Sequence, residues 1–452
     1  MMSPTPSQDQ LETWDRTHYW HAFTQMEEYE PLIIERAEGV WLYDIKGRRL
    51  LDGASSMWCN VHGHNHPVMN KAIEKQLHRV CHATSLGMSC DVTIELSKRL
   101  IDVTPGGLEH VFFSSDGSSA NEVALKAAFQ YWRQCDTPQP QKTKYLAFGQ
   151  AYHGDTLGAA SVGGIGKFHD IFQPLLFEVI RTASPDVRRL PPGVTGEAAA
   201  QYFLDEVETV LQANADELAA IVIEPLVQGA AGMAMQPLGF VRGLRQLATQ
   251  YNVLLIVDEV ATGFGRTGSM FACDSEQISP DFLTLGKGLT GGYLPMAATL
   301  TSNKIWRTFL GDAASGRALY HGHTYSGNPL SAAAAMACLD LFEAEQTLEQ
   351  LPAKIEHLGD RLSTLAEHPH VINARQRGMV VALDLVADKQ TGQAFGPEQR
   401  VGQRLAAEAL NRGVWLRARP DMAYTLPPLA ISHDEIDLLM DAMAAGIDAA
   451  TS

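Results

Sequence analysis

A single lysine stands among small residues in the stretch Gly286-Lys287-Gly288, directly after the apolar run Phe282 to Leu285. That run predicts a buried strand, and few side chains near the turn that follows it can solvate an ammonium group. We therefore expect a lowered pKa for Lys287, which favours the free amine that imine formation with an aldehyde requires. A loop lysine that reaches solvent explains the same segment equally well.

A second candidate is the acid Asp258, which ends the apolar run Val253 to Val257. A carboxylate at the end of a buried strand is unfavourable unless a cation or several hydrogen-bond donors meet it. Ligands of open α/β sheets bind beyond the carboxyl ends of the strands, so Asp258 is suitably placed to meet a protonated ring nitrogen. The alternative is a carboxylate that caps a neighbouring helix.

The segment that follows the predicted strand Val111 to Ser114 has the features of a phosphate site. It opens a predicted helix that runs to about Trp132, and Ser119 with Glu122 fits a capping box. The first turn of a helix has free N–H groups, so Gly117 and Ser118 can bind a phosphate with backbone donors, a hydroxyl group and the helix dipole. The alternative is an ordinary capped helix without a ligand.

Two further strand ends supply polar or aromatic groups. Tyr152 follows the predicted strand Tyr145 to Phe148, and its ring is suited to stacking on a flat cofactor. Glu224 ends the predicted strand Ala220 to Ile223. Because several such ends supply polar groups to one rim, together they indicate a binding site more strongly than any of them does alone.

The elements that must position these residues alternate between short apolar runs and longer amphipathic ones, which is typical of βα units. The apolar runs do not alternate with polar residues, which suits strands covered on both faces. We expect an α/β fold with a large domain built on a central, mostly parallel sheet and a small α+β domain. The predicted division is residues 71–330 for the large domain, with residues 1–70 and 331–452 forming the small one. Its expected elements are the strand-turn-strand pattern of residues 39–51, a helix over 351–366, and strands over 379–385 and 414–417.

Composition excludes several classes of function. Hydrophobic residues make up 45% and charged residues 19% of the 452 residues, which is an ordinary globular balance. The net charge of -17, from 35 basic and 52 acidic residues, disfavours nucleic acid and anionic membrane surfaces as partners. Six cysteines without CxxC pairing, no apolar leader in residues 1–20 and no membrane-length apolar stretch predict a cytoplasmic protein with free thiols.

Two short patterns indicate other sites but fit them poorly. Residues Gly263 to Gly268 satisfy GxGxxG after a strand, but two acids intervene and the next residues are a poor helix start for a dinucleotide site. His62, His64 and His66 alternate, yet no cysteine or carboxylate completes a zinc-binding pattern. We expect no metal.

Taken together, these segments resemble the class III, fold type I aminotransferases that use pyridoxal 5'-phosphate. The specific stretch runs from Leu255 to Val260, through the glycines of residues 263–268, to Gly286-Lys287-Gly288. The resemblance implies that Lys287 carries the cofactor and that Asp258 pairs with its pyridine nitrogen. In the reaction it implies, Lys287 also moves the proton between the substrate and the cofactor.

Within this family, four segments look like the members that convert 8-amino-7-oxononanoate to 7,8-diaminononanoate in biotin biosynthesis. They are residues 18–21, 23–26, 58–64 and 152–156. The resemblance implies a homodimer with shared active sites, and it assigns roles to residues of this chain. Those at the cofactor are Gly117, Ser118, Tyr152, Glu224, Asp258, Lys287, His323 and Thr324, with Thr324 reaching the phosphate from the other subunit. Those at the substrate are Trp58, Tyr152, Lys287, Gly322 and Arg417, with Arg417 holding the carboxylate of the keto substrate.

The chain departs from the family pattern at two places. Members that use S-adenosylmethionine as amino donor carry Trp-Trp and Pro-Tyr where this sequence has Met57-Trp58 and Ala22-Phe23. Relatives with Phe-Thr-Gln-Met and a single tryptophan use lysine, and this sequence resembles them at those positions. We nevertheless rank S-adenosylmethionine first, because it is the commoner donor in the family, and lysine second. The segment 418–420 departs from the usual Arg-Pro pattern, which makes Arg419 a competitor for the role of Arg417.

Two rival functions remain at this point. A class III transaminase for ω-amino acids or amines with pyruvate as acceptor would have the same fold and cofactor. A non-catalytic cofactor-binding or NAD-binding protein is disfavoured by the matching positions of Asp258 and Lys287.

Overall fold

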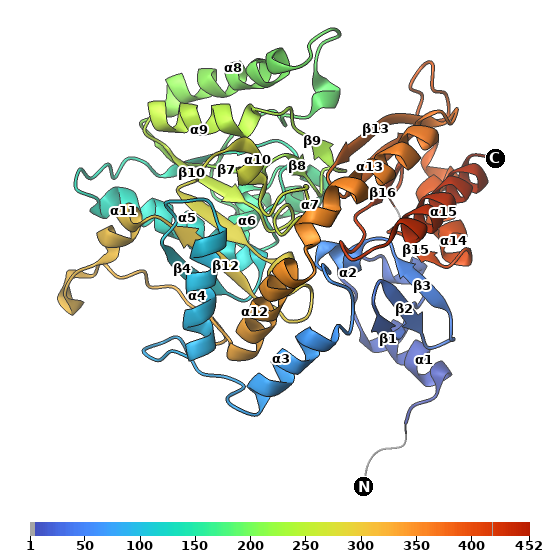
Figure 1. The fold of residues 1–452 in the computed structure, drawn as a ribbon. Helices are drawn as coiled ribbons and strands as arrows, with labels where there is room; N and C mark the ends of the chain where they lie inside the picture. The colour runs from blue at the N-terminus through green and yellow to red at the C-terminus, as the bar shows by residue number, and fades with distance from the viewer. Residues whose placement is uncertain (1–4, 418) are drawn as a thin grey trace.

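A seven-stranded sheet forms the centre of the fold in the computed structural model, which describes residues 5–417 and 419–452 (Figure 1). In spatial order its strands are β4 (His110–Ser114), β12 (Ala297–Thr301), β11 (Phe282–Leu285), β10 (Leu254–Asp258), β7 (Leu218–Ile223), β5 (Lys144–Phe148) and β6 (Ile180–Thr182). Only β12 runs antiparallel to its neighbours in this sheet. The predicted α/β class with a mostly parallel sheet is therefore confirmed.

Both faces of this sheet are covered, which explains why its strands are apolar throughout. Along β10, Leu255 and Val257 pack into the core shared with α8 and α9, whereas Leu254 and Ile256 pack into the core shared with α5. The helices that accompany the sheet are α3 (Pro67–Leu77), α4 (Asp91–Val103), α5 (Gly117–Gln134), α6 (Leu157–Val162), α7 (Gly166–His169), α8 (Glu197–Asn214), α9 (Phe240–Gln250), α10 (Ala272–Glu276), α11 (Asn303–Trp306) and α12 (Pro329–Ala344).

A second sheet joins segments from the two ends of the chain. Strands β1 (Ile34–Glu38), β2 (Trp41–Asp44) and β3 (Arg49–Asp52) are antiparallel, and β15 (Val414–Trp415) pairs with β3 in parallel. The predicted strand over 414–417 is thus shorter than expected. The remaining elements of these two segments are α1 (Gln8–His18), α2 (Ser55–Trp58), α13 (Thr347–Ala366), β13 (Val371–Arg377), β14 (Val380–Leu385), α14 (Val401–Asn411), β16 (Met422–Thr425) and α15 (His433–Thr451).

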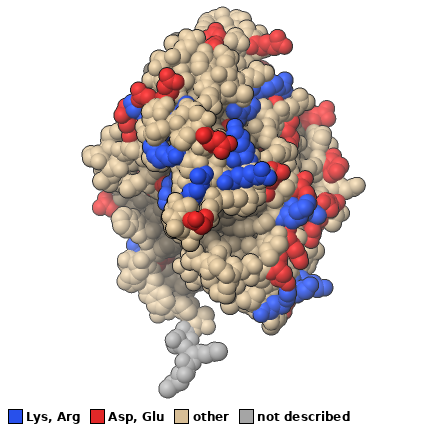
Figure 2. Space-filling view, turned by 90° about the vertical axis from the view of Figure 1, so that its left-hand side faces the viewer, with Lys and Arg blue, Asp and Glu red and all other residues tan. Residues whose placement is uncertain are grey.

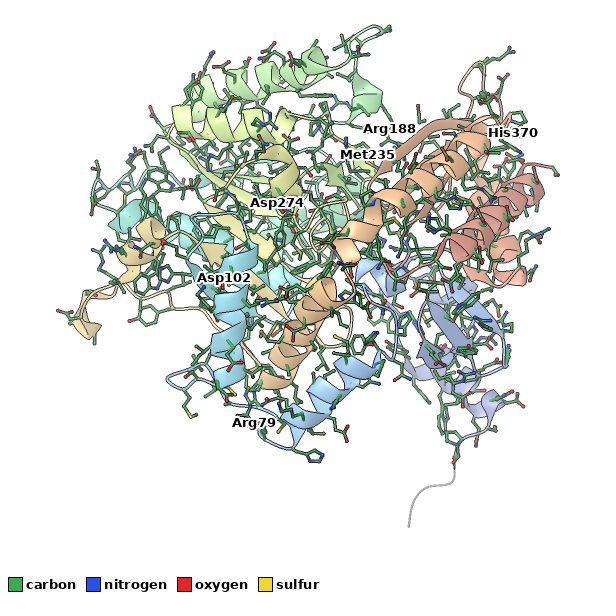
Figure 3. All side chains as sticks on the ribbon, viewed as in Figure 1. Arg79, Asp102, Arg188, Met235, Asp274 and His370 are labelled. Atoms are coloured by element: carbon green, nitrogen blue, oxygen red, sulfur yellow. The ribbon has the colours of Figure 1, made fainter. Side chains whose placement is uncertain are left out.

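The C-terminal sheet β13-β14-β16 is fastened to loops that follow the central strands. Arg188, at the edge of this sheet in Figure 3, has its Nη1 atom 3.1 Å from Oδ2 of Asp384 in β14. Arg375 of β13 donates to the carbonyl oxygens of Gly232 and Met233, at 2.6 and 3.0 Å. The two hydrogen bonds from Arg375 fix the loop between the hairpin strands β8 (Val227–Gln228) and β9 (Ala234–Met235).

The surface carries no field of a single sign on the face shown in Figure 2, where acidic and basic side chains are interspersed and large areas carry neither. No helix in the described part of the chain is long and apolar enough to cross a membrane. The same residues contain no group of three or more His, Cys, Asp or Glu side chains that could hold a metal ion.

Candidate active site

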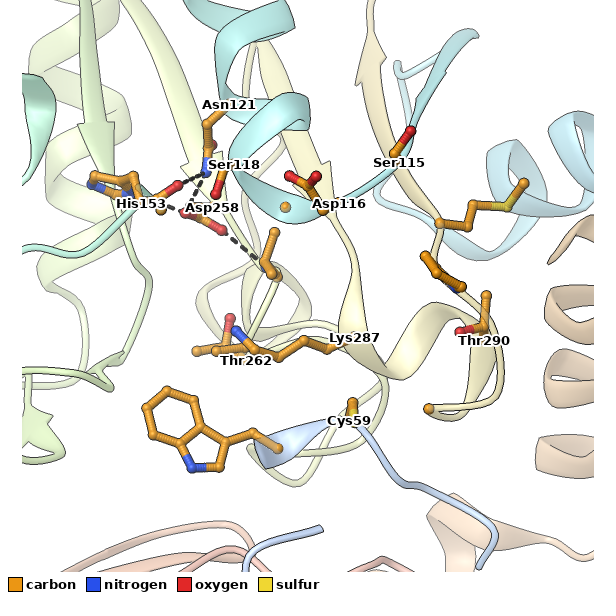
Figure 4. A pocket seen from close by; sticks show the side chains of 18 of the residues that line it. Cys59, Ser115, Asp116, Ser118, Asn121, His153, Asp258, Thr262, Lys287 and Thr290 are labelled. Atoms are coloured by element: carbon orange, nitrogen blue, oxygen red, sulfur yellow. Dashed lines mark hydrogen bonds and ion pairs between the residues drawn. The ribbon is translucent and has the colours of Figure 1, made fainter. Parts of the chain in front are cut away.

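The carboxyl ends of five parallel strands meet at one cavity of about 460 Å³. Figure 4 shows side chains that line it, among them Asp258, His153 and Lys287. Parallel strands end at the same edge of a sheet, so side chains that follow β4, β5, β7, β10 and β11 are brought together. Among the residues that line the cavity are Gly117, Ser118, Tyr152, Glu224, Asp258 and Lys287. Six of the residues predicted for the cofactor therefore line one cavity.

Lys287 lies just after β11 in a tight turn with positive φ (41°). Burial lowers the pKa of its amino group, although the charges of Asp258 and Glu224 oppose this shift. The following residue must be small, because a Cβ atom at Gly288 would lie 2.8 Å from Cβ of Phe264. The Nζ atom of Lys287 lies 5.3 Å from the ring centroid of Trp58.

Asp258 is buried, and both of its carboxylate oxygens are held by donors. Oδ2 accepts from Nδ2 of Asn121 and lies close to Nδ1 of His153, each at 2.8 Å, and Oδ1 accepts from the N–H of Val260 at 3.0 Å. Although burial opposes protonation of His153, the hydrogen bond to Asp258 and its charge raise the pKa of this imidazole. Thr284 in turn donates to Oδ1 of Asn121 at 3.0 Å, which orients the amide.

Sequence reasoning missed His153 and Asn121 as partners of Asp258. His153 directly follows Tyr152, and Asn121 lies in the first turns of helix α5, so both residues belong to segments that were selected for other residues. The sequence did indicate that Asp258 needs partners, because a buried carboxylate requires hydrogen-bond donors. Which donors reach it depends on how the strand ends are placed in space.

Glu224 connects two loops at the base of the cavity. Its carboxylate accepts the N–H of Tyr152 on Oε1 and the N–H of Gly229 on Oε2, both at 3.0 Å. Burial raises the pKa of Glu224 to about 7, although these two hydrogen bonds act in the opposite direction. The phenol of Tyr152 donates to Asp155 at 2.7 Å, and burial together with this bond raises the pKa of Tyr152.

The start of helix α5 differs from the predicted capping box. The N-cap is Asp116, whose Oδ1 accepts the N–H of Ser119 at 2.8 Å, and Glu122 instead accepts the N–H of Gly158 at 2.7 Å. The prediction at Ser119 and Glu122 was wrong because Asp, also a preferred N-cap residue, starts the helix three residues earlier. The N–H groups of Gly117 and Ser118 keep no partner within the helix.

Glycine is required at two places around this helix start. A Cβ atom at Gly117 would lie 2.6 Å from Cγ1 of Val260. One at Gly154, where φ is 119°, would lie 1.9 Å from Oγ of Ser118. The backbone therefore forms a close-fitting cradle in front of the helix.

An outer cavity of about 320 Å³ adjoins the first, and Trp58, Tyr152 and Lys287 line both. Its other walls are apolar or aromatic, including Phe23, Met57, Phe168, Met233, Met422 and Tyr424. Arg417 and Arg419 also line it, and Nη2 of Arg419 donates to the carbonyl of Ala230 at 3.3 Å. Among the described residues no carboxylate forms an ion pair with either arginine.

Comparison with known families decides the assignment of this site. The sequence model described as aminotransferase class III matches residues 23–447. The chain belongs to the class III aminotransferases. It is therefore an enzyme of amino-group transfer, as the sequence predicted.

Individual relatives of this aminotransferase extend over nearly its whole length. An adenosylmethionine-8-amino-7-oxononanoate aminotransferase from Geobacter sulfurreducens is 47% identical over 98% of each chain. The crystal structure of the enzyme of that name from Methanocaldococcus jannaschii superposes with a TM-score of 0.91 at 40% identity, over 98% of this chain and 99% of that one. An (S)-enantioselective omega-transaminase from Thermomicrobium roseum gives a TM-score of 0.95 at 34% identity, over 99% of this chain and 100% of that one.

Some predicted site residues of the aminotransferase lie away from both cavities in the single chain. Gly322, His323 and Thr324 line neither, and the N–H of His323 donates to Oγ of Ser326 at 3.1 Å. Ala418, which begins the segment 418–420 that departs from the family pattern, lies outside the described residues.

The two poorly fitting patterns also have structural explanations. The glycines of residues 263–268 form turns, and the helix after them, α10, has only five residues. The three histidines do not meet at one point. Nε2 of His62 meets the carbonyl of Cys338 and Nε2 of His64 meets Asp52, while Nδ1 of His62 and Nε2 of His66 approach Glu345 at 3.8 and 3.0 Å.

Proposed function

We propose that this aminotransferase uses pyridoxal 5'-phosphate and that the inner cavity holds it. The donor set fits such a group: a buried carboxylate at Asp258, an amine of lowered pKa at Lys287, and a glycine cradle at Gly117 and Gly154 before a helix N-terminus. The cradle has no room for a Cβ atom, which leaves the N–H groups of Gly117 and Ser118 to bind the phosphate. Tyr152 then supplies an aromatic face for the ring.

Bound there, pyridoxal phosphate supplies an aldehyde that captures amines and a ring that accepts electrons. The protein's part follows from four side chains. Lys287 would hold the aldehyde, and its Nζ atom would carry a proton between the reacting carbons. Asp258 would face the ring nitrogen and favour its protonated form, and His153 with Asn121 keeps the Asp258 carboxylate oriented.

The reaction we propose is the conversion of 8-amino-7-oxononanoate to 7,8-diaminononanoate, a step of biotin biosynthesis. The observation that carries the enzyme class is the meeting of Lys287 and Asp258 in one cavity. The substrate is supported by the relatives of that name and by the outer cavity, whose apolar walls suit an alkyl chain and whose Arg417 suits a carboxylate.

The amino donor we propose is S-adenosylmethionine, with lysine second. Family members that use this donor have a tryptophan at the position of Met57 and a tyrosine at the position of Phe23. The outer cavity of this chain therefore lacks one indole ring and one phenol hydroxyl. Trp58, Tyr152 and Phe168 nevertheless offer aromatic faces there, each able to contribute about 0.5–2 kcal/mol with a sulfonium or an adenine ring.

We also propose a homodimer that works in the cytoplasm. The predicted roles of Gly322, His323 and Thr324 at the cofactor and substrate require a second copy, because none of the three lines the inner or the outer cavity of its own chain.

Product analysis tests this function. The holoenzyme is incubated with 8-amino-7-oxononanoate and either S-adenosylmethionine or lysine, and formation of 7,8-diaminononanoate is followed by mass spectrometry. The absorbance of the bound cofactor, measured with each donor alone, separates the donors. A response to lysine with none to S-adenosylmethionine reverses our ranking, and no product with either donor contradicts the proposed substrate.

One observation favours a second candidate, an omega-transaminase that transfers amino groups from simple amines to pyruvate. The Thermomicrobium structure superposes over 99% of this chain. Incubation with 1-phenylethylamine and pyruvate distinguishes the candidates. Alanine formation at a higher kcat/KM than that for 8-amino-7-oxononanoate selects the second.

A further inference from the structure

Four consecutive residues without glycine adopt left-handed backbone conformations beside the active site. The φ angles of Ser55, Ser56, Met57 and Trp58 are 50°, 46°, 69° and 72°. They form one left-handed helical turn, since the N–H of Trp58 donates to the carbonyl of Ala54 at 2.8 Å. This conformation is unfavourable for residues with a Cβ atom and normally occurs at isolated positions. A whole turn therefore requires contacts that hold it.

The main holding group is the carboxylate of Asp52, which has no exposed surface. Its Oδ1 accepts the N–H of Ser56 at 3.0 Å and the N–H of Ala54 at 3.2 Å. Its Oδ2 accepts the hydroxyl of Ser56 at 2.9 Å and lies 3.0 Å from Nε2 of His64. One buried carboxylate thus meets the turn at three donors and is itself anchored by a histidine.

A second anchor holds the same turn from the opposite end of the chain. The hydroxyl of Ser55 donates to the carbonyl of Leu426 at 2.6 Å and accepts from Nη2 of the buried Arg266 at 3.3 Å. The turn is therefore fixed on both sides by groups that belong to other elements.

The turn determines where the Trp58 ring lies. The ring is buried against the loop between β8 and β9, where a Cβ atom at Gly229 would lie 2.8 Å from its Cζ3 atom. Nζ of Lys287 lies 5.3 Å from the ring centroid, and the ring of Tyr424 meets it edge-on at 6.4 Å. The handedness of a helical turn determines the direction in which each of its side chains points. If residues 55–58 adopted right-handed conformations, the Trp58 ring would point away from both cavities.

We propose that Asp52 is a positioning residue for the reaction. By holding the left-handed turn, its carboxylate fixes the Trp58 ring against Lys287 and Gly229, and so sets the wall shared by the two cavities. Asp52 itself lines neither cavity. Its effect on substrate binding therefore passes through Trp58, and only this kinetic effect rests on the proposed function.

Thermal unfolding of the holoenzyme tests whether the turn is strained. Ser56→Gly and Ser56→Ala both remove the hydroxyl, but only glycine adopts the left-handed conformation freely. We expect the glycine variant to melt about 1–2 °C or more above the alanine variant. Ser363, an exposed serine in the right-handed helix α13 whose hydroxyl donates to Gly359, is the matched control, and there the order should be reversed. Alanine above glycine at both positions overturns the proposal.

Steady-state kinetics test whether Asp52 acts through Trp58. We expect Asp52→Asn and Trp58→Ala each to raise the KM for 8-amino-7-oxononanoate by about tenfold with a smaller change in kcat. The double variant should be no worse than Trp58→Ala alone, because the ring that Asp52 positions is already absent. Multiplying effects in the double variant, or an unchanged KM in Asp52→Asn, contradict the proposal.

Two further measurements keep the outcome decisive. If Asp52→Asn does not fold, Ser56→Ala, which removes a single hydrogen bond of Asp52, replaces it in the same cycle with Trp58→Ala. If the enzyme does not turn over 8-amino-7-oxononanoate, the proposed function fails. The melting comparison at Ser56 still decides whether the turn is strained.

Discussion

The Nδ1 atom of His153 lies 2.8 Å from Oδ2 of Asp258, and the two residues are only 2% and 5% exposed. The amide of Asn121 donates to the same oxygen and the N–H of Val260 donates to the other, so the carboxylate is oriented before any ligand arrives. Preorganised charge of this kind stabilises a protonated ring at little reorganisation cost.

Asp258→Asn should reduce kcat for amino transfer by at least about a thousandfold, since an amide stabilises a protonated ring far less than a carboxylate does. The substitution is nearly isosteric, so thermal unfolding should show a folded protein. Steady-state rates with the donor that the wild type uses provide the measurement. An almost unchanged rate would mean that another acid holds the ring.

His153→Gln should have a smaller effect, a loss of about 10- to 100-fold in kcat. The variant replaces an imidazole whose protonation Asp258 favours by an uncharged amide, so the charge on the donor is lost; hydrogen bonds to charged groups are typically worth about 1.5–3 kcal/mol. Asp258 remains, so cofactor absorbance should persist. A rate within twofold of wild type would show that Asn121 and Val260 suffice to orient Asp258.

The sequence allowed the central strands to be predicted closely because they are long apolar runs bounded by turns. Expected strands over 282–285 and 220–223 match β11 and lie within β7. The fit is poorer where propensity competes with tertiary contacts. Strand β12 was not predicted, and the helix start at Asp116 was placed three residues late. The division at residues 70 and 330 remains a prediction, supported by the pairing of β15 with β3.

For the site, residue type and strand position together were sufficient to predict that Lys287, Asp258 and Glu224 face one rim. They were not sufficient to identify partners that come from distant segments, such as Asn121 or the anchors of the left-handed turn at Ser55. A left-handed turn in residues without glycine has no local sequence signal, since it is held by contacts with Asp52 and Leu426. Such features follow only from the fold.

Arg417→Ala should weaken binding of the keto substrate by about 2–4 kcal/mol, the scale for losing one partner of a desolvated charge pair. Arg419 lines the same cavity, so Arg419→Ala is the matched comparison. We expect the larger rise in KM for 8-amino-7-oxononanoate from Arg417→Ala. The reverse order would assign the substrate carboxylate to Arg419.

The stability of the cofactor-free protein should depend on pH through Glu224. Burial raises the pKa of this carboxyl from 4.5 to about 7, so the folded state favours its protonated form. That stabilisation is present below pH 4.5 and is lost as pH rises to about 7, a change of up to about 3 kcal/mol. Glu224→Gln should flatten this part of the profile relative to wild type in urea unfolding at several pH values. Parallel profiles would show that Glu224 does not titrate in this range.

The most direct test of the proposed chemistry is the activity of Lys287→Ala. The substitution removes the amine and introduces no buried charge, so the protein should fold, bind pyridoxal phosphate without the absorbance band of the lysine-bound cofactor, and fail to form 7,8-diaminononanoate over many turnovers. Lys287→Arg, which keeps a cation at the same place, is the matched control and should be equally inactive. Multiple-turnover transamination by Lys287→Ala at a rate near that of the wild type would contradict the central role of Lys287.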